Sequence, residues 1–219
     1  MDGNGRWAKS RRLPRVAGHK AGMDAVRSVV DAAPKLGIEV LTLYAFSSEN
    51  WKRPQEEVGF LFGLLKTYLL GEIAELDAND VRVQCIGDWR ALPAELVTLL
   101  EGAITRTANN RGLTLVLALN YGSRDELVRA VRKAVATNGH DSHAIDADMI
   151  DAALDTAHLP APDLIVRTSG EQRLSNFLLW QSAYAELVFT ETLWPDFDGA
   201  ALADACAAYA RRERRYGGL

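Results

Sequence analysis

The chain has 219 residues, of which 48% are hydrophobic and 25% are charged, and its formal net charge is −4. This composition is typical of a globular protein that buries its core without disulfides, and the negative charge argues against general nucleic-acid binding. No window reaches the roughly 18 apolar residues of a membrane-spanning helix and the polar amino end is not a signal peptide, so we expect a cytoplasmic protein with at most peripheral membrane contact.

Apolar runs alternate with helical periodicity along the chain. The apolar runs predict strands at residues 40–46, 81–86, 113–119, 164–166 and 187–189, and the periodic segments predict helices at 20–36, 57–76, 93–108, 124–136, 146–157 and 199–214. Residues 137–142 predict a surface loop. The alternation indicates the α/β class: a single domain over residues 1–219, with a mainly parallel central sheet and helices on both faces.

The first candidate site lies at the amino end, where Asp2-Gly3-Asn4-Gly5-Arg6-Trp7 precedes further arginines and His19. Two glycines around an asparagine let the backbone point N–H groups at an anion, and arginines can clamp phosphate oxygens. An acid beside such a site suits a diphosphate-bound Mg²⁺. A flexible basic tail with a chance turn is the alternative. The segment lacks the Gly-Lys-Ser/Thr ending of a P-loop.

Two further polar loops follow predicted strands, at the strand ends where α/β proteins bind ligands. Residues 47–54 follow the first strand and read either as a ligand loop or as a surface loop with a helix cap. Residues 167–176 offer arginines and serines around a glycine, which is the chemistry of a second anion pocket. The nearly all-apolar segment 58–70 is either a core helix or the wall of an apolar tunnel. Glu186, within an apolar strand, suits a salt bridge or a metal contact equally well.

Five stretches, at residues 2–7, 47–54, 120–122, 167–181 and 194–197, together resemble the ordered motifs of the cis-prenyltransferases, whose bacterial members include undecaprenyl diphosphate synthase. The similarity extends from residue 2 to Gly218. It implies an Mg²⁺-dependent prenyltransferase that condenses isopentenyl diphosphate with an allylic diphosphate, expected to be farnesyl diphosphate. The expected product is a cis-polyprenyl diphosphate, undecaprenyl diphosphate for a cell-wall lipid carrier. Alternatives are a shorter-chain synthase or a non-catalytic partner subunit.

The resemblance also implies roles for individual residues. Asp2 and Asn50 would be catalytic, and Asp2 and Glu186 would hold the metal. The allylic diphosphate would be bound by Gly3, Asn4, Gly5, Arg6, Trp7, Arg15, His19, Ser47, Trp51 and Arg53. The isopentenyl diphosphate would be bound by Arg167, Arg173 and Ser175. Glu57 would help to position the reacting ends, and product length would depend on packing among Ala45, Phe60, Leu61, Leu64 and Leu113.

Three further expectations come from comparison with the family pattern. The family's enzymes are homodimers, and Arg215-Tyr216-Gly217 resembles a segment that reaches the active site across the interface. Ser123 replaces a usual glycine and is expected to form a capping box with Glu126. Members carry a strand before the Asp-Gly-Asn-Gly motif. That first strand is missing from the chain as given: the start site is misassigned, the chain was trimmed, or the sheet is one strand short. Only the last of these would expose a sheet edge and leave Asp2 unanchored.

Overall fold

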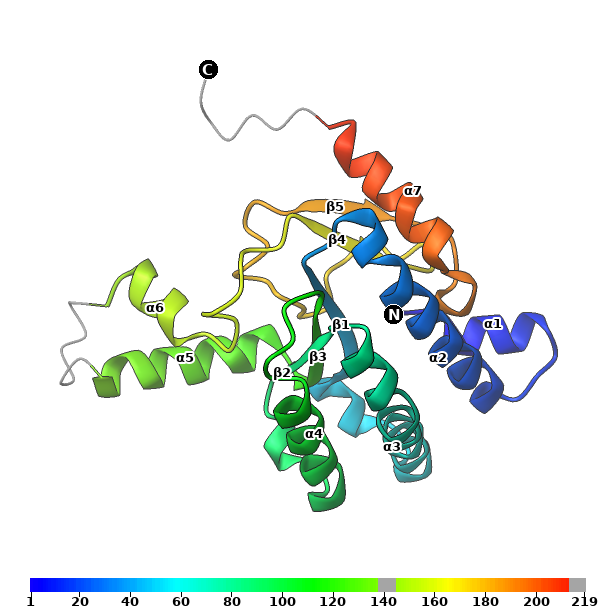
Figure 1. Cartoon of the computed structure of the whole chain (residues 1–219), viewed down its shortest axis with the longest axis horizontal. Helices are drawn as coiled ribbons and strands as arrows, with labels where there is room; N and C mark the ends of the chain where they lie inside the picture. Colours follow the sequence, from blue (N-terminus) through cyan, green and yellow to red (C-terminus); the bar gives the residue numbers. More distant parts are fainter. Residues whose placement is uncertain (138–144, 213–219) are drawn as a thin grey trace.

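The computed structural model describes residues 1–137 and 145–212 (Figure 1). Its strands are β1 (Val40–Ser47), β2 (Arg82–Ile86), β3 (Thr114–Tyr121), β4 (Leu164–Arg167) and β5 (Glu186–Phe189). Its helices are α1 (Asn4–Ser10), α2 (Arg15–Ala32), α3 (Gln55–Ala78), α4 (Ala94–Arg106), α5 (Ser123–Thr137), α6 (Ala147–Ala153) and α7 (Gly199–Ala210). Short 3₁₀ turns include η2 (Ser48–Lys52) and η5 (Trp194–Asp196). All five predicted strands are confirmed.

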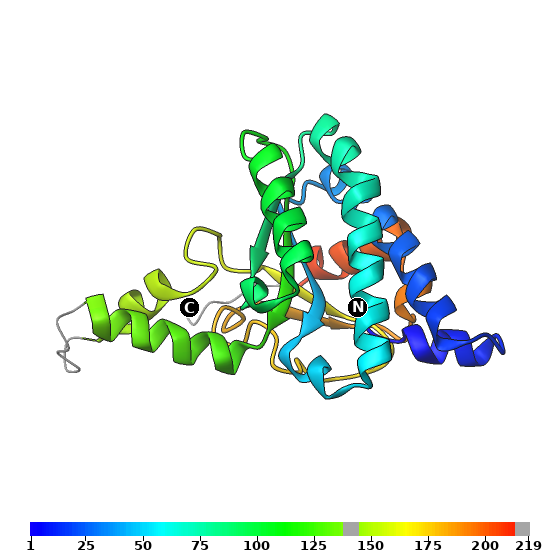
Figure 2. The same cartoon turned by 90° about the horizontal axis from the view of Figure 1, so that it is seen from below.

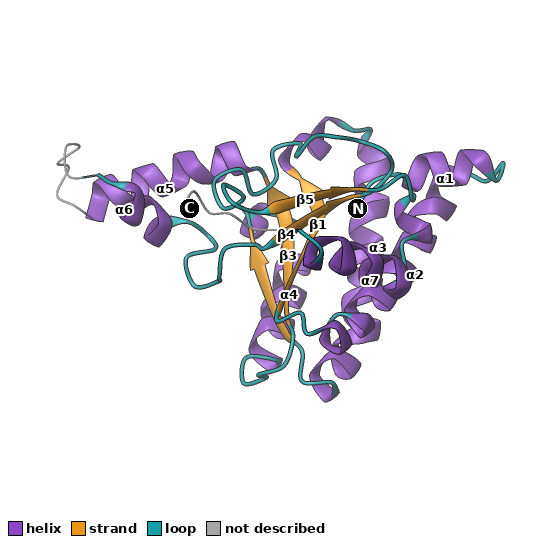
Figure 3. Cartoon of the chain, turned by 90° about the horizontal axis from the view of Figure 1, so that it is seen from above, coloured by secondary structure: helices purple, strands orange, loops and turns teal. Residues whose placement is uncertain are grey.

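The strand pairings are parallel, as predicted, but they form two pieces. β3 lies between β1 and β2 in a three-stranded sheet, with Leu43 opposite Leu117, and β4 pairs separately with β5. Figure 3 shows the two pieces set at a steep angle to each other. The α/β class is confirmed, and the carboxyl ends of β1, β3 and β4 all carry polar motif residues.

The core follows from the alternation of side chains along β3. Leu115, Leu117 and Leu119 face a large apolar cluster with residues of α2, α3, α4 and α7, so these helices cover one face of the sheet. Val116 and Ala118 face the other side, where Leu178 and neighbouring loop residues cover the sheet. The pair α5 and α6 has a small apolar cluster of its own and extends to one end of the molecule (Figure 2).

The main difference from the predicted elements is α1. Gly3, Asn4 and Gly5 are poor helix formers, so the sequence predicts a loop there, yet residues 4–10 are helical. Close packing on α2 explains the helix: a Cβ at Gly18 would lie 2.0 Å from the backbone oxygen of Asn4, so only glycine permits this approach. The predicted helix at 146–157 ends early, at Ala153. Within the described residues no helix is both long and apolar enough to cross a bilayer.

Most of the predicted loop at 137–142 and the segment Arg215-Tyr216-Gly217 lie outside the described residues. Their predicted roles stay predictions.

Candidate active site

The backbone of Asp2 is held by the carboxyl-terminal part of the chain. Its N–H donates to the Thr168 hydroxyl at 2.9 Å, and that hydroxyl donates to the Asp2 carbonyl at 2.9 Å. The N–H of Trp194 donates to the same carbonyl at 2.9 Å. Asp2 is therefore anchored by Thr168, which directly follows β4, and by Trp194 of η5, and the expectation that it is left unanchored is wrong.

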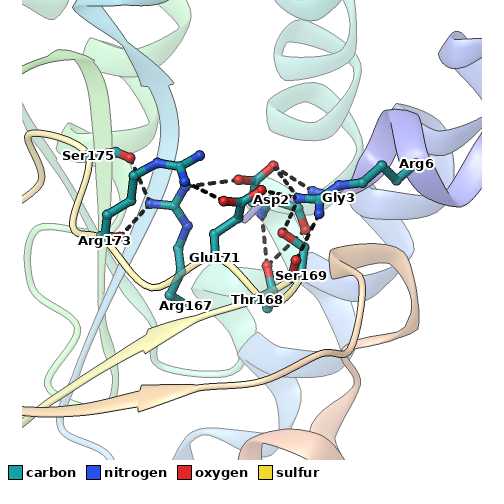
Figure 4. A network of polar contacts seen from close by, with 9 residues as sticks. All are labelled: Asp2, Gly3, Arg6, Arg167, Thr168, Ser169, Glu171, Arg173 and Ser175. Atoms are coloured by element: carbon teal, nitrogen blue, oxygen red, sulfur yellow. Dashed lines mark hydrogen bonds and ion pairs between the residues drawn. The ribbon is translucent and has the colours of Figure 1, made fainter.

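The Asp2 carboxylate lies between two arginines (Figure 4). Arg167 Nη2 donates to Oδ2 at 2.9 Å, the Gly3 N–H donates to Oδ1 at 2.7 Å, and Arg6 Nη2 lies 3.9 Å from Oδ1. Burial alone would raise the pKa of Asp2, but the hydrogen bonds from Arg167 and Gly3, together with the charge of Arg167, hold this pKa below its ordinary value. Asp2 is thus an ionised carboxylate with an exposed face.

The predicted second anion pocket is assembled around Arg167. Its Nη1 donates to the carbonyl of Arg173 at 2.8 Å and to the hydroxyl of Ser175 at 2.9 Å, so all three predicted residues come together. Arg173 pairs with Glu171. The loop has a constrained backbone: Ser169 and Ser175 both have positive φ, at 76° and 49°. Non-glycine residues in this conformation are uncommon and cluster at functional sites.

A cavity of about 190 Å³ opens beside Asp2 between α2, α3, β1 and β3. Its polar residues include Asp2, Gly3, Asn4, Gly5, Arg15, His19, Asn50 and Arg53. Its apolar residues include Val26, Leu43, Ala45, Leu61, Leu64, Leu65, Tyr68, Leu117 and Leu119. The segment predicted to be a core helix or a tunnel wall lies in α3, which contributes to the core and also lines this cavity. Phe60 and Leu113, which were expected to shape the tunnel, do not line this cavity.

Glu57, at the start of α3, is the counter-ion of the cationic residues in this cavity. Arg53 Nη1 donates to Oε1 at 2.9 Å, Arg15 Nη1 lies 3.2 Å from Oε2, and His19 Nε2 lies 3.7 Å from Oε1. Burial and the charge of Arg15 lower the pKa of His19, although Glu57 opposes them. The surroundings of His19 therefore favour its neutral form.

The loop after β1 is organised by its own side chains. Ser47 and Asn50 form a reciprocal capping box, with the Ser47 N–H donating to Asn50 Oδ1 at 3.0 Å. Trp51 Nε1 donates to Asn120 Oδ1 at 2.8 Å, which ties η2 to the end of β3. These contacts hold Asn50 in the cavity wall.

Two predicted site residues lie apart from the others. Trp7 donates its indole N–H to Asp196 at 2.7 Å and is stacked by Arg11, so it ties α1 to η5. Glu186 begins β5 opposite Leu164, whereas Arg167 ends β4, so the two are at opposite ends of the strand pair. Glu186 pairs with Arg212, and the structure does not bring it together with Asp2. Of its two sequence readings, the salt bridge is the one observed.

Residues without a predicted role complete the site. Ser169 accepts hydrogen bonds from Arg6 at its carbonyl, 2.9 Å, and at its hydroxyl, 2.6 Å, and Glu171 lies 3.1 Å from Arg6. Thr168 and Trp194 hold Asp2. Thr168, Ser169 and Trp194 stand within the motifs, but no local pattern indicates that they contact residues 2–6, more than 160 positions away.

The predicted capping box at Ser123 is wrong. The Ser123 hydroxyl accepts a hydrogen bond from the Leu179 N–H at 3.0 Å. Glu126 is almost fully buried and bonds to other residues. Its Oε1 accepts from the Asp155 N–H at 3.0 Å, and its Oε2 accepts from Tyr121 and from Gln181. Partners far along the chain thus replace the local reciprocal bonds.

An arginine-lined mouth leading into an apolar cavity, at the carboxyl ends of parallel strands, defines a binding protein for an amphiphile with an anionic head. The family model described as "Putative undecaprenyl diphosphate synthase" matches residues 1–217. The chain belongs to this family.

Curated relatives and a solved structure agree with this assignment. The isoprenyl transferases of Zymomonas mobilis and Agrobacterium fabrum are 57% and 54% identical to the chain, and each alignment covers 100% of the chain and 90% of the relative. The lavandulyl diphosphate synthase of Lavandula x intermedia, solved with dimethylallyl diphosphate, superposes with a TM-score of 0.95. It is 38% identical, and the superposition covers 99% of this chain and 95% of that one.

Proposed function

We propose that the chain elongates an allylic prenyl diphosphate by condensing it with isopentenyl diphosphate. The observation that carries this proposal is the ionised Asp2 carboxylate, which lies between Arg6 and Arg167 at the mouth of an apolar cavity. The cavity suits the prenyl tail, and the mouth suits its diphosphate. A non-catalytic partner subunit is disfavoured because relatives of that kind lose motif residues, whereas the chain keeps Asp2, Asn4, Arg6, Arg167, Arg173 and Ser175.

The two diphosphates are assigned to separate subsites. We place the allylic diphosphate against Arg15, Arg53, His19 and the backbone of residues 3–6, and the isopentenyl diphosphate against Arg167, Arg173 and Ser175. His19 Nε2 and Arg167 Nε are buried without a hydrogen-bond partner among the described residues, so each has a free position for a diphosphate oxygen. Positioned cations stabilise the negative charge of the leaving diphosphate. Asn50, fixed by Ser47, is positioned to orient the reacting ends.

Mg²⁺ is the proposed cofactor, and Asp2 fits it. Magnesium is usually held by one or two carboxylates with substrate phosphates and water, and Asp2 offers one ionised, half-exposed carboxylate. The described residues contain no group of three or more acids, histidines or cysteines close enough to hold a metal, so most of its ligands would come from diphosphate and water. When bound, the ion neutralises diphosphate charge and assists its departure. Glu186 would become a ligand of the ion only if the residues around it rearranged.

The cavity favours a short primer over a long product. Its volume of about 190 Å³ is below the roughly 300 Å³ at which typical ligand pockets begin. A long undecaprenyl chain needs a larger displacement of α3 from the sheet than a shorter-chain product does. The size of the cavity is the observation that favours the second candidate, a shorter-chain synthase.

We also propose a cytoplasmic homodimer. Leu179, Trp180, Tyr184 and Phe189 are large apolar side chains exposed within one segment, and Tyr184 is 82% exposed. Exposed apolar patches of this kind mark interfaces between proteins. Light scattering of the full chain tests the dimer.

The enzyme proposal is tested by incorporation of radiolabelled isopentenyl diphosphate into butanol-extractable product. The reaction contains farnesyl diphosphate and Mg²⁺, and chromatography of the product gives its length. Incorporation that needs all three components is expected. A cooperative unfolding transition shows that the protein used is folded. If folded protein incorporates no label, the chain does not elongate prenyl diphosphates.

A further inference from the structure

The connection between α1 and α2 projects at one end of the long axis of the molecule, away from α5 and α6 (Figures 1 and 2). Residues 9–16 of this connection are all exposed. Leu13 and Val16 are each 45% exposed, although both are aliphatic. We call residues 9–20 the α1–α2 tip.

Backbone contacts define the conformation of the α1–α2 tip. Arg12 adopts a left-handed conformation with φ of 56°, and the N–H of Leu13 returns to the carbonyl of Ala8 at 2.9 Å. Pro14 then caps α2, and the contact between Gly18 and Asn4 locks the two helices together. The fold thus presents Leu13 to solvent as a fixed feature.

The segment that contains the α1–α2 tip is basic, unlike the chain as a whole. Residues 3–23 hold six of the 25 lysines and arginines and none of the 29 acidic residues. Arg6, Arg11 and Arg15 have acidic partners elsewhere in the fold. For Lys9, Arg12 and Lys20, no acidic partner lies within ion-pair distance in residues 1–137 and 145–212, so their charges are available to an external anion.

An open hollow joins the α1–α2 tip to the active site. It holds about 560 Å³ and is lined by Asp2, Arg6 and Arg15 as well as by Lys9, Arg12 and Leu13. The mouth for the anionic head of the substrate therefore lies next to the projecting basic and apolar surface. Basic side chains around exposed aliphatic ones are what an anionic bilayer binds: cations pair with lipid phosphates, and aliphatic groups enter the interface.

We propose that the α1–α2 tip docks the enzyme on an anionic membrane surface through Lys9, Arg12 and Lys20, with Leu13 and Val16 entering the headgroup region. The alternative is that these residues are simply a solvated helix end. That alternative accounts for the exposed cations, but it does not account for the two exposed aliphatic side chains. Docking here places the mouth of the active site beside the bilayer, where a polyprenyl product has to go. The peripheral membrane contact that the sequence allows is thereby assigned to one surface of the fold.

The test is sedimentation of the full chain, without substrates, with vesicles of phosphatidylcholine alone or mixed with phosphatidylglycerol. We expect binding only to the mixed vesicles, weakened by salt. Lys9→Glu with Arg12→Glu should weaken binding roughly 20-fold or more, since each surface cation contributes roughly fivefold. Leu13→Ser with Val16→Ser should weaken binding roughly tenfold while keeping every charge.

A matched control is available at the other end of α2. Lys35→Glu, Leu36→Ser and Arg111→Glu alter two exposed cations and an exposed leucine far from the α1–α2 tip and should leave vesicle binding unchanged. Urea unfolding shows whether each variant is folded. The proposal is overturned by absent binding, by equal binding to neutral vesicles, or by an equal loss in the control. Filter binding of RNA provides a further test. The proposal is also overturned if the protein retains RNA, the charge variant retains less RNA, and the aliphatic variant binds vesicles normally. The surface would then be a nucleic-acid site.

Discussion

Arg167 donates a hydrogen bond of 2.9 Å to the carboxylate of Asp2, joining the two proposed diphosphate subsites through one ion pair. The same guanidinium also holds Ser175 and the carbonyl of Arg173. A diphosphate that binds Arg167 therefore changes the environment of Asp2 directly. This coupling provides a physical link between filling one subsite and preparing the other.

Asp2→Asn should lower kcat by roughly 100-fold or more, because the variant lacks the charge that would hold Mg²⁺ on the diphosphate. The pKa of Asp2 is below its ordinary value of 3.8, so its stabilising effect is present above pH 3.8 and is lost as pH falls through the lower folded value. The variant should therefore lose less stability in acid. Incorporation kinetics and acid titration of unfolding measure both effects, and a kcat within tenfold of the wild type would contradict the assigned role.

The pKa of His19 should shift in opposite directions when its acidic and its basic neighbour are replaced. Glu57→Gln should lower its pKa further, because Glu57 raises it, whereas Arg15→Gln should raise it. The ring signals can be followed by proton NMR and assigned with His19→Gln. Because the folded pKa lies below the ordinary value of 6.5, His19 contributes stability above pH 6.5 that is lost as pH falls through the folded pKa. A shift of the same sign in both variants would refute this arrangement.

Glu126→Gln should destabilise the fold by about 2 kcal/mol. The carboxylate accepts hydrogen bonds on both oxygens, and an amide has only one acceptor, so either Asp155 N–H or the Tyr121 and Gln181 donors lose their partner. Burial raises the pKa of Glu126, although bonds from Tyr121 and Gln181 oppose it. Urea unfolding measures the cost. Glu101→Gln, at an exposed position of α4, is the matched control, and equal effects of the two would argue against the network.

Ala45→Leu should shorten the product. Ala45 lines the cavity on β1 and faces a space of about 190 Å³, so three added carbons remove a substantial part of it. Chromatography of the labelled products should show a shift to fewer isoprene units with primer still consumed. Phe60→Leu is the comparison, since Phe60 is on α3 but does not line the cavity. A product shift in Phe60→Leu but not in Ala45→Leu would place the tunnel elsewhere.

The sequence predicts the strands and the two arginine-containing loops because these depend on local patterns. The run from Val40 to Phe46 is apolar on both faces and is a strand, and Arg167 stands at a strand end. Periodicity also predicts most of the long helices. Together these patterns indicate the fold class and the edge of the sheet where ligands bind.

Contacts between distant segments account for what the sequence does not predict. α1 forms because Gly18 admits close packing, which overrides the weak helix propensity of Asn4 and Gly5. Glu126 turns to Asp155 instead of capping its own helix, and Glu186 pairs with Arg212. None of these partners is fixed by local spacing, so only the assembled chain identifies them.

The clasp of Asp2 by Thr168 and Trp194 also has a consequence for synthesis of the protein. Asp2 leaves the ribosome well before its partners, which are translated more than 160 residues later. Such contacts have high sequence separation and close slowly compared with local ones. With Asp2 in its proposed role, catalytic competence requires that the chain has been made and folded through Trp194, and a truncated chain that retains only the parallel strands β1, β2 and β3 would lack it.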